Sequence, residues 1–88
     1  MLTLPEAAVM VELQTGPKNL AELAAGAGEL SIGIGLTVMH LEQAGFVIGY
    51  GLPRSYGLSK AGELAIENWF KAVNRLRIRR RASQNTWD

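Results

Sequence analysis

The side chains best suited to chemistry in this chain are cationic, and they gather towards one end. Residues 71–88 carry 6 − 1 = +5, whereas residues 1–70, with three cations and seven glutamates, carry 3 − 7 = −4. Basic blocks of this kind often contact anionic partners. The alternative is a solvated helix end whose cations complement the negative end of the helix dipole. The basic positions are Lys71, Arg75, Arg77, Arg79, Arg80 and Arg81, of which the first, second and fourth recur every four residues along one helical stripe.

Other groups that could support catalysis or metal binding are few. His40 is the only histidine and the chain has no cysteine, which argues against a zinc site and excludes a thiolate nucleophile. No serine has a histidine and a carboxylate in a recognisable order around it. The glycine pairs at 26/28 and 33/35 lack the preceding strand and the third glycine of a nucleotide-binding loop. We therefore expect no enzyme activity, no metal and no cofactor.

Length and composition fit one small globular domain. We expect this domain over residues 1–81 of the 88, with a frayed tail over residues 82–88. The hydrophobic fraction of 48% is ordinary for a globular protein. The longest apolar-leaning run, residues 30–41, is too short to span a bilayer, and the N-terminus lacks the basic region of a signal peptide. The sequence thus predicts a cytoplasmic protein without membrane contact.

Two short helices are predicted in the first third of the chain. Thr3 and Asn19 are each followed three residues later by a glutamate, the capping-box pattern of a helix N-terminus. Pro5 suits a first helical turn, and the glycine and proline at 16–17 end the first helix. A glycine-rich turn over residues 26–29 ends the second helix and lets the chain leave it at a steep angle.

A third helix is predicted between an N-cap at Ser31 and a C′ glycine at Gly45. Ile34, Val38 and Leu41 recur at i, i+4 and i+7 and are expected in the core. Two glycines inside this helix would each cost roughly 1 kcal/mol relative to alanine, which suggests a close approach to DNA or to another protein. The positions expected to face outward are Ile32, Gly33, Gly35, Leu36, His40 and Gln43, none of them lysine or arginine.

A hairpin and a long helix complete the predicted elements. Residues 46–48 and 54–58 read as strands, and Arg54 stands where it could reach a phosphate or a minor groove. The last helix is expected from about Ser59 to about Arg80. Its large apolar residues exceed what one small core needs, so we expect a second subunit to pack against it. The expected dimer residues are Leu64, Trp69, Phe70, Val73 and Leu76.

This order of elements is that of a winged helix-turn-helix, a mainly α fold with a small β-hairpin in the α+β class. Three segments resemble the DNA-binding core of the MarR/PadR type of winged-helix regulators. They are LAELA at 20–24, LEQAGFV at 41–47 and RSYGLSKAG at 54–62. The resemblance covers roughly residues 3–70 of the chain. It implies a regulator that binds DNA.

Two functions remain open on the sequence. The first is a small, repressor-like transcriptional regulator that binds duplex DNA as a homodimer through the third helix, the wing and the basic last helix. The second is an interaction module that docks an apolar protein surface through the third helix, which the acidic residues 1–70 favour. The residues expected to contact DNA are Lys18, Ser31, Ile32, Gly33, Gly35, Leu36, Thr37, His40, Arg54, Lys71, Arg75, Arg79, Arg80 and Arg81.

Overall fold

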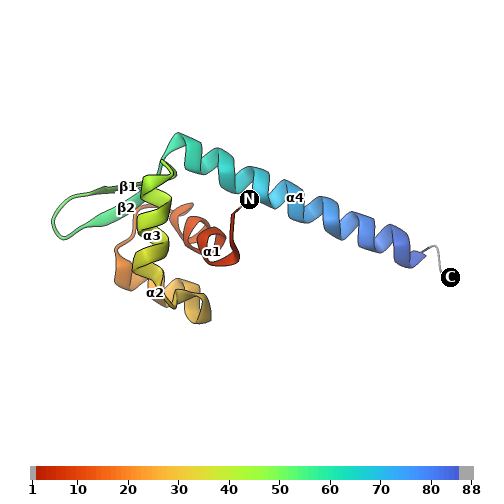
Figure 1. Ribbon diagram of the computed structural model, residues 1–88, viewed down its shortest axis with the longest axis horizontal. Coiled ribbons are helices and arrows are strands. Elements are labelled where there is room, and N and C mark those ends of the chain that lie inside the picture. The colour runs from red at the N-terminus through yellow and green to blue at the C-terminus, as the bar shows by residue number, and fades with distance from the viewer. Residues whose placement is uncertain (1, 86–88) are drawn as a thin grey trace.

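A computed structural model describes the backbone of residues 2–85 and the side chains of residues 2–76 other than 29 and 31. Three helices and a hairpin gather at one end of a fourth, much longer helix (Figure 1). The expected mainly α fold with one small antiparallel hairpin is therefore confirmed. The elements in chain order are α1 (Leu4–Leu13), α2 (Leu20–Ala27), the 3₁₀ helix η1 (Gly28–Ser31), α3 (Ile34–Gln43), β1 (Val47–Tyr50), β2 (Ser55–Leu58) and α4 (Lys60–Asn85).

Both predicted capping boxes are present and fix where α1 and α2 begin. The Thr3 backbone N–H donates to Glu6 Oε1 at 2.8 Å, and the Glu6 N–H donates back to Thr3 Oγ1 at 3.3 Å. The Asn19 N–H donates to Glu22 Oε1 at 3.0 Å, and the Glu22 N–H donates to Asn19 Oδ1 at 2.8 Å. Because each box satisfies two backbone N–H groups at an otherwise open helix end, the starts of both helices are encoded locally.

The third helix begins later than the sequence predicted. Ser31 is not its N-cap but the last residue of η1, and α3 starts at Ile34 with Gly33 as the N-cap. Gly33 has a φ of 70°, in the left-handed region that glycine adopts without strain. The prediction of a Ser31 cap with two glycines inside the helix was therefore wrong, since only Gly35 lies within α3. The predicted C′ glycine, Gly45, does end α3, with a φ of 82°.

The core lies where α1, α3 and one face of the hairpin meet, with α2 and the first half of α4 closing it. Val38 and Leu41 are fully buried as predicted, and Ile34 packs against them half-buried. The spacing rule that placed them inward is thus confirmed for α3. The buried hydrophobic residues are Ala7, Val9, Met10, Leu13, Leu23, Val38, Leu41, Val47, Tyr56 and Ile66.

The hairpin is joined to the helical body through the segment between α1 and α2. Val47 pairs with Leu58 and Tyr50 with Ser55 across the two antiparallel strands. On the other side of β2, the Lys18 N–H donates to the Tyr56 carbonyl at 3.0 Å and the Tyr56 N–H donates to the Lys18 carbonyl at 2.8 Å. This backbone pair holds the hairpin against the start of α2.

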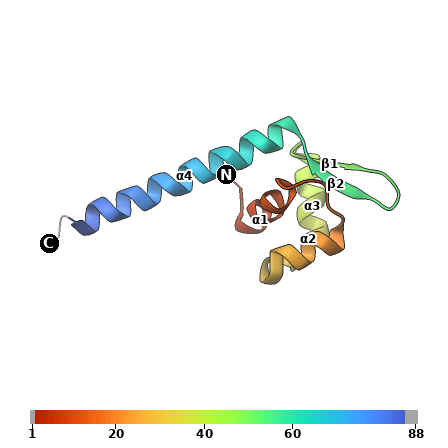
Figure 2. The ribbon, with the colours of Figure 1, turned by 180° about the vertical axis from the view of Figure 1, so that it is seen from behind.

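The last helix packs closely, at its first turn, on the rest of the fold. We call that part, from α1 to β2, the body. Ser59 caps α4, since its Oγ accepts the Gly62 N–H at 3.0 Å. Gly62 lies so near the residue before β1 that a Cβ there would overlap the Phe46 carbonyl oxygen. The helix then continues past the body (Figure 2) to Asn85, beyond the end expected near residue 80. Residues 82–85 of the predicted tail are thus helical, and residues 86–88 lie outside the described part of the chain.

Across the part of the chain that the structure describes, no helix combines the length and the hydropathy needed to cross a lipid bilayer.

Candidate functional site

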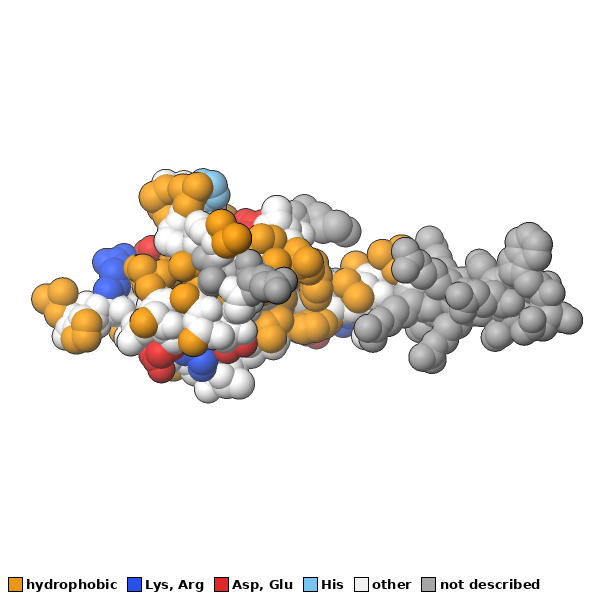
Figure 3. Space-filling model, turned by 90° about the horizontal axis from the view of Figure 1, so that it is seen from below, with side chains coloured by type: hydrophobic (Ala, Val, Ile, Leu, Met, Phe, Trp, Pro, Cys, Tyr) orange, Lys and Arg blue, Asp and Glu red, His pale blue; other side chains and the backbone are white. Residues whose placement is uncertain are grey.

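The face of α3 that turns away from the core combines apolar side chains with a histidine and a glutamine. Leu36 is 55% exposed and Met39 44% exposed, and His40 and Gln43 are exposed beside them. Positions 36, 39, 40 and 43 share one side of a helix by their three- and four-residue spacing. Ile32, just before α3, is 88% exposed. Figure 3 shows hydrophobic side chains next to the histidine on this surface. The sequence reasoning missed Met39, although its spacing from Leu36 carried the signal.

Two predicted contact residues of this region behave differently from expectation. Thr37 is half-buried and its hydroxyl donates to the Gly33 carbonyl at 3.2 Å, so that donor is used within its own helix. The side chain of Ser31 lies outside the described side chains. Gly33 and Gly35 are both exposed, and a Cβ at either position would meet open space. The glycines thus leave the start of α3 open to a close approach.

The N-terminus of α3 has no side-chain cap, unlike those of α1 and α2. Gly33 has no side chain that could accept, so no capping side chain bonds the N–H groups of Ile34, Gly35 and Leu36, which have no intrahelical partner. These groups also stand at the positive end of the helix dipole. N–H groups without a side-chain cap in this setting are suited to bind a phosphate oxygen.

Arg54, the arginine of the hairpin, forms an ion pair with Glu42 of α3. Its Nη2 donates to Glu42 Oε2 at 2.9 Å, and its guanidinium lies 5.6 Å from the centre of the Tyr56 ring. Gly49 makes room for this path, because a Cβ there would stand 2.6 Å from Arg54 Nη2. The hydrogen bond and charge of Glu42 raise the pKa of Arg54 above its usual range. Arg54, which the sequence predicted could reach a phosphate or a minor groove, is therefore paired with Glu42 in this structure.

The remaining expected cations lie in two separate places. The Lys18 Nζ donates to Thr15 Oγ1 at 2.8 Å, on the loop that leads into α2. On α4, Lys71 Nζ lies 3.3 Å from Glu67 Oε1 in an exposed i, i+4 ion pair. Arg75 is exposed one turn further on. Figure 1 shows this second half of α4 pointing away from α3 and the hairpin. The side chains of Arg79, Arg80 and Arg81 lie outside the described side chains.

The residues expected at a dimer interface do not all share one side of α4. Trp69 and Val73 are half-buried, while Phe70 and Leu76 are 39% and 57% exposed. Trp69 packs against the core, and its ring meets that of Phe70 edge-on with centroids 5.4 Å apart. Leu64 is 58% exposed, but at about 100° per residue it lies roughly 140° from Trp69 and 120° from Leu76. Leu64 therefore belongs to a different surface.

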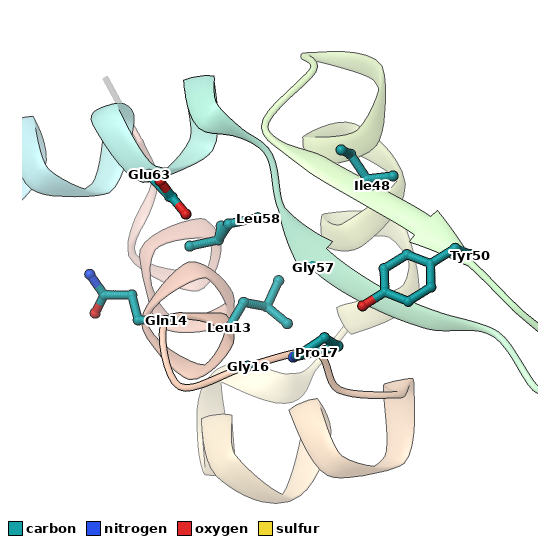
Figure 4. A pocket seen from close by; sticks show the side chains of 9 residues that line it. All are labelled: Leu13, Gln14, Gly16, Pro17, Ile48, Tyr50, Gly57, Leu58 and Glu63. Atoms are coloured by element: carbon teal, nitrogen blue, oxygen red, sulfur yellow. The ribbon is translucent and has the colours of Figure 1, made fainter.

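Two hollows adjoin these surfaces. The first, of about 660 Å³, opens between the end of α1 and the hairpin, where Figure 4 shows Tyr50 and Pro17 facing each other. The second, of about 380 Å³, lies between the body and α4. Among the described residues no group of three or more acidic or histidine side chains is placed to hold a metal ion. The second hollow is lined by Leu2, Glu6, Phe46, Ala65, Asn68, Trp69 and Ala72.

No protein-family model matches the chain, and no curated protein matches it either.

Proposed function

We propose that this protein is a small winged helix-turn-helix regulator that binds duplex DNA as a dimer. The observation that supports this most is the uncovered outer face of α3, which stands between α2 and a hairpin fixed to the same body. In this arrangement α3 enters the major groove, which admits one α-helix, and the hairpin acts as the wing on the flanking backbone.

The exposed side chains of α3 favour base contacts over phosphate contacts. Leu36 and Met39 suit the methyl group of thymine, while His40 and Gln43 can hydrogen-bond to base edges. The uncapped N–H groups at the start of α3 suit a phosphate. Further phosphate contacts come from the basic half of α4, which supplies the positive charge that the acidic body lacks.

A second candidate function is docking to another protein. It is favoured by the apolar surface of Ile32, Leu36 and Met39, by the lack of lysine and arginine on α3, and by the charge of −4 over residues 1–70. On this alternative the fold is retained, and α3 packs into an apolar groove of a partner.

A mobility-shift assay on genomic DNA fragments, repeated over a series of salt concentrations, tests the proposal. Leu36→Asp places a carboxylate at the centre of the α3 face and should abolish binding. Leu64→Asp is the matched control, since Leu64 is equally exposed but lies on α4. We expect the control to bind like the wild type. No binding at any salt concentration would exclude DNA as the partner, and equal losses in both variants would exclude α3 as the interface.

A further inference from the structure

One stripe of α4 has the spacing of a helix-pairing seam. Ala65, Trp69, Ala72 and Leu76 follow one another at four, three and four positions, the a/d spacing of a coiled coil. Small and large residues alternate along it. The first three are half-buried, and Leu76 is 57% exposed where α4 has left the body.

The body leaves the first part of this stripe open. Ala65, Trp69 and Ala72 form one wall of the 380 Å³ hollow, and Leu2 and Phe46 form much of the opposite wall. The hollow is therefore an apolar space alongside α4, on the side that the stripe faces. An aliphatic side chain entering from outside would bury apolar surface on both walls.

We propose that α4 of a second copy of this chain packs along this stripe in the antiparallel direction. The proposal rests on the dimer of the proposed function and adds its direction and register. With the crossing point between residues 70 and 71, Trp69 lies opposite the partner subunit's Ala72, and Ala65 lies opposite the partner subunit's Leu76. Each large side chain then meets a small one, and the leucine enters the hollow.

A parallel pair would match the side chains poorly. Trp69 would face its own copy across the seam, and so would Ala72. Two indoles would then compete for one space, while two alanines would leave a gap one turn away. Overpacking and cavities both destabilise an interface core, so the alternation of sizes favours the antiparallel direction.

The distribution of charge favours the same direction. Parallel helices would align two segments of +5 each, with repulsion along their length. Antiparallel helices bring each basic segment alongside the acidic body of the other subunit, which carries −4 over residues 1–70. Glu6, at the edge of the hollow, is one carboxylate in that path.

Cross-linking of single-cysteine variants tests the direction, because the chain has no cysteine of its own. Ala61→Cys and Arg79→Cys both lie on α4 on one flank of the stripe, 79 − 61 = 18 positions, five full turns and about 27 Å apart. A short bismaleimide linker should join the two variants when they are mixed and should join neither to itself. Efficient linking of each variant to itself would show a parallel pair and overturn the proposal, as would a monomer in light scattering at high micromolar concentration.

A substitution in the seam gives a second test. Ala72→Leu should weaken the dimer about tenfold or more, because the leucine meets the indole of the partner subunit's Trp69. In a parallel pair the same change would fill the gap between two alanines and strengthen the dimer. Asn74→Leu, on an exposed side of α4 away from the stripe, should leave the dimer unchanged. Circular dichroism confirms folding, and because no DNA is present, these outcomes are independent of the DNA-binding proposal.

Discussion

Two glycines that lie inside helices have opposite surroundings. Gly35, in the first turn of α3, is exposed, and an added Cβ would meet nothing within 4 Å. Gly62, in the first turn of α4, is buried against the Phe46 carbonyl oxygen, which an added Cβ would overlap. Helix propensity favours alanine at both positions. The backbone contact of Gly62 should outweigh that preference, because the carbonyl oxygen is not the end of a flexible side chain.

We expect Gly62→Ala to lower the free energy of unfolding by about 1–3 kcal/mol, the usual cost of overpacking a tight contact. Gly35→Ala, as the matched control, should raise it by up to about 1 kcal/mol through propensity alone. Urea denaturation followed by circular dichroism measures both. Equal stabilisation in the two variants would mean that α4 does not pack on β1 as closely as described.

At the scale of elements, the hairpin is held at two points on opposite sides. Lys18 pairs with Tyr56 through the backbone, and Arg54 reaches Glu42 near the end of α3. The side chains of the ion pair are 55% and 28% exposed, so water screens it and a phosphate can compete for the guanidinium. If the protein binds DNA as proposed, Glu42 would therefore set how much of the charge of Arg54 is available to a phosphate.

Glu42→Gln keeps the shape of the side chain but removes its charge. We expect DNA affinity to rise, and the slope of log affinity against log salt to steepen by about 0.9, the value for one added phosphate contact. The unfolding midpoint should change little, since an exposed pair contributes little to stability. Fluorescence anisotropy titrations over several salt concentrations provide the measurement. Glu63→Gln, which removes an exposed charge from α4, is the control; an equal effect there would point to net charge instead.

At the scale of the whole molecule, charge is divided along the chain. Residues 1–70 carry a net charge of −4, and residues 71–88, which include the second half of α4, carry a net charge of +5. In an antiparallel dimer each basic segment returns towards the other subunit's body, which would bring cations nearer to both copies of α3. In one chain the negative charge of residues 1–70 is unfavourable for DNA binding. In the proposed dimer the positive charge of the other subunit's residues 71–88 would offset it.

Removal of residues 79–88 should weaken DNA binding alike for all sequences and make its salt dependence shallower. The deleted segment contains Arg79, Arg80 and Arg81, which are expected to contact phosphates, and phosphate contacts carry no base information. The seam residues up to Leu76 remain, so a dimer should still be detected by light scattering at high protein concentration. Unchanged affinity and salt slope would show that this segment takes no part in DNA binding.

The sequence by itself determined the local parts of the structure. Thr3 and Asn19 start their helices because each pairs with a glutamate three residues away. The spacing of Ile34, Val38 and Leu41 placed one side of α3 in the core. Strand-forming residues around a glycine-rich tip gave the hairpin. These signals act over a few residues, so they can be read without knowing the rest of the fold.

Only the tertiary structure decided which surfaces are free and which groups are engaged. Gly33, rather than Ser31, starts α3, because the chain first turns through η1. Arg54 is held by Glu42, twelve positions away, and Gly62 is fixed by the carbonyl of Phe46. The physical reason is common to all three. Each depends on where separate elements pack against one another, and a pattern read along one segment contains no information on the position of its neighbours.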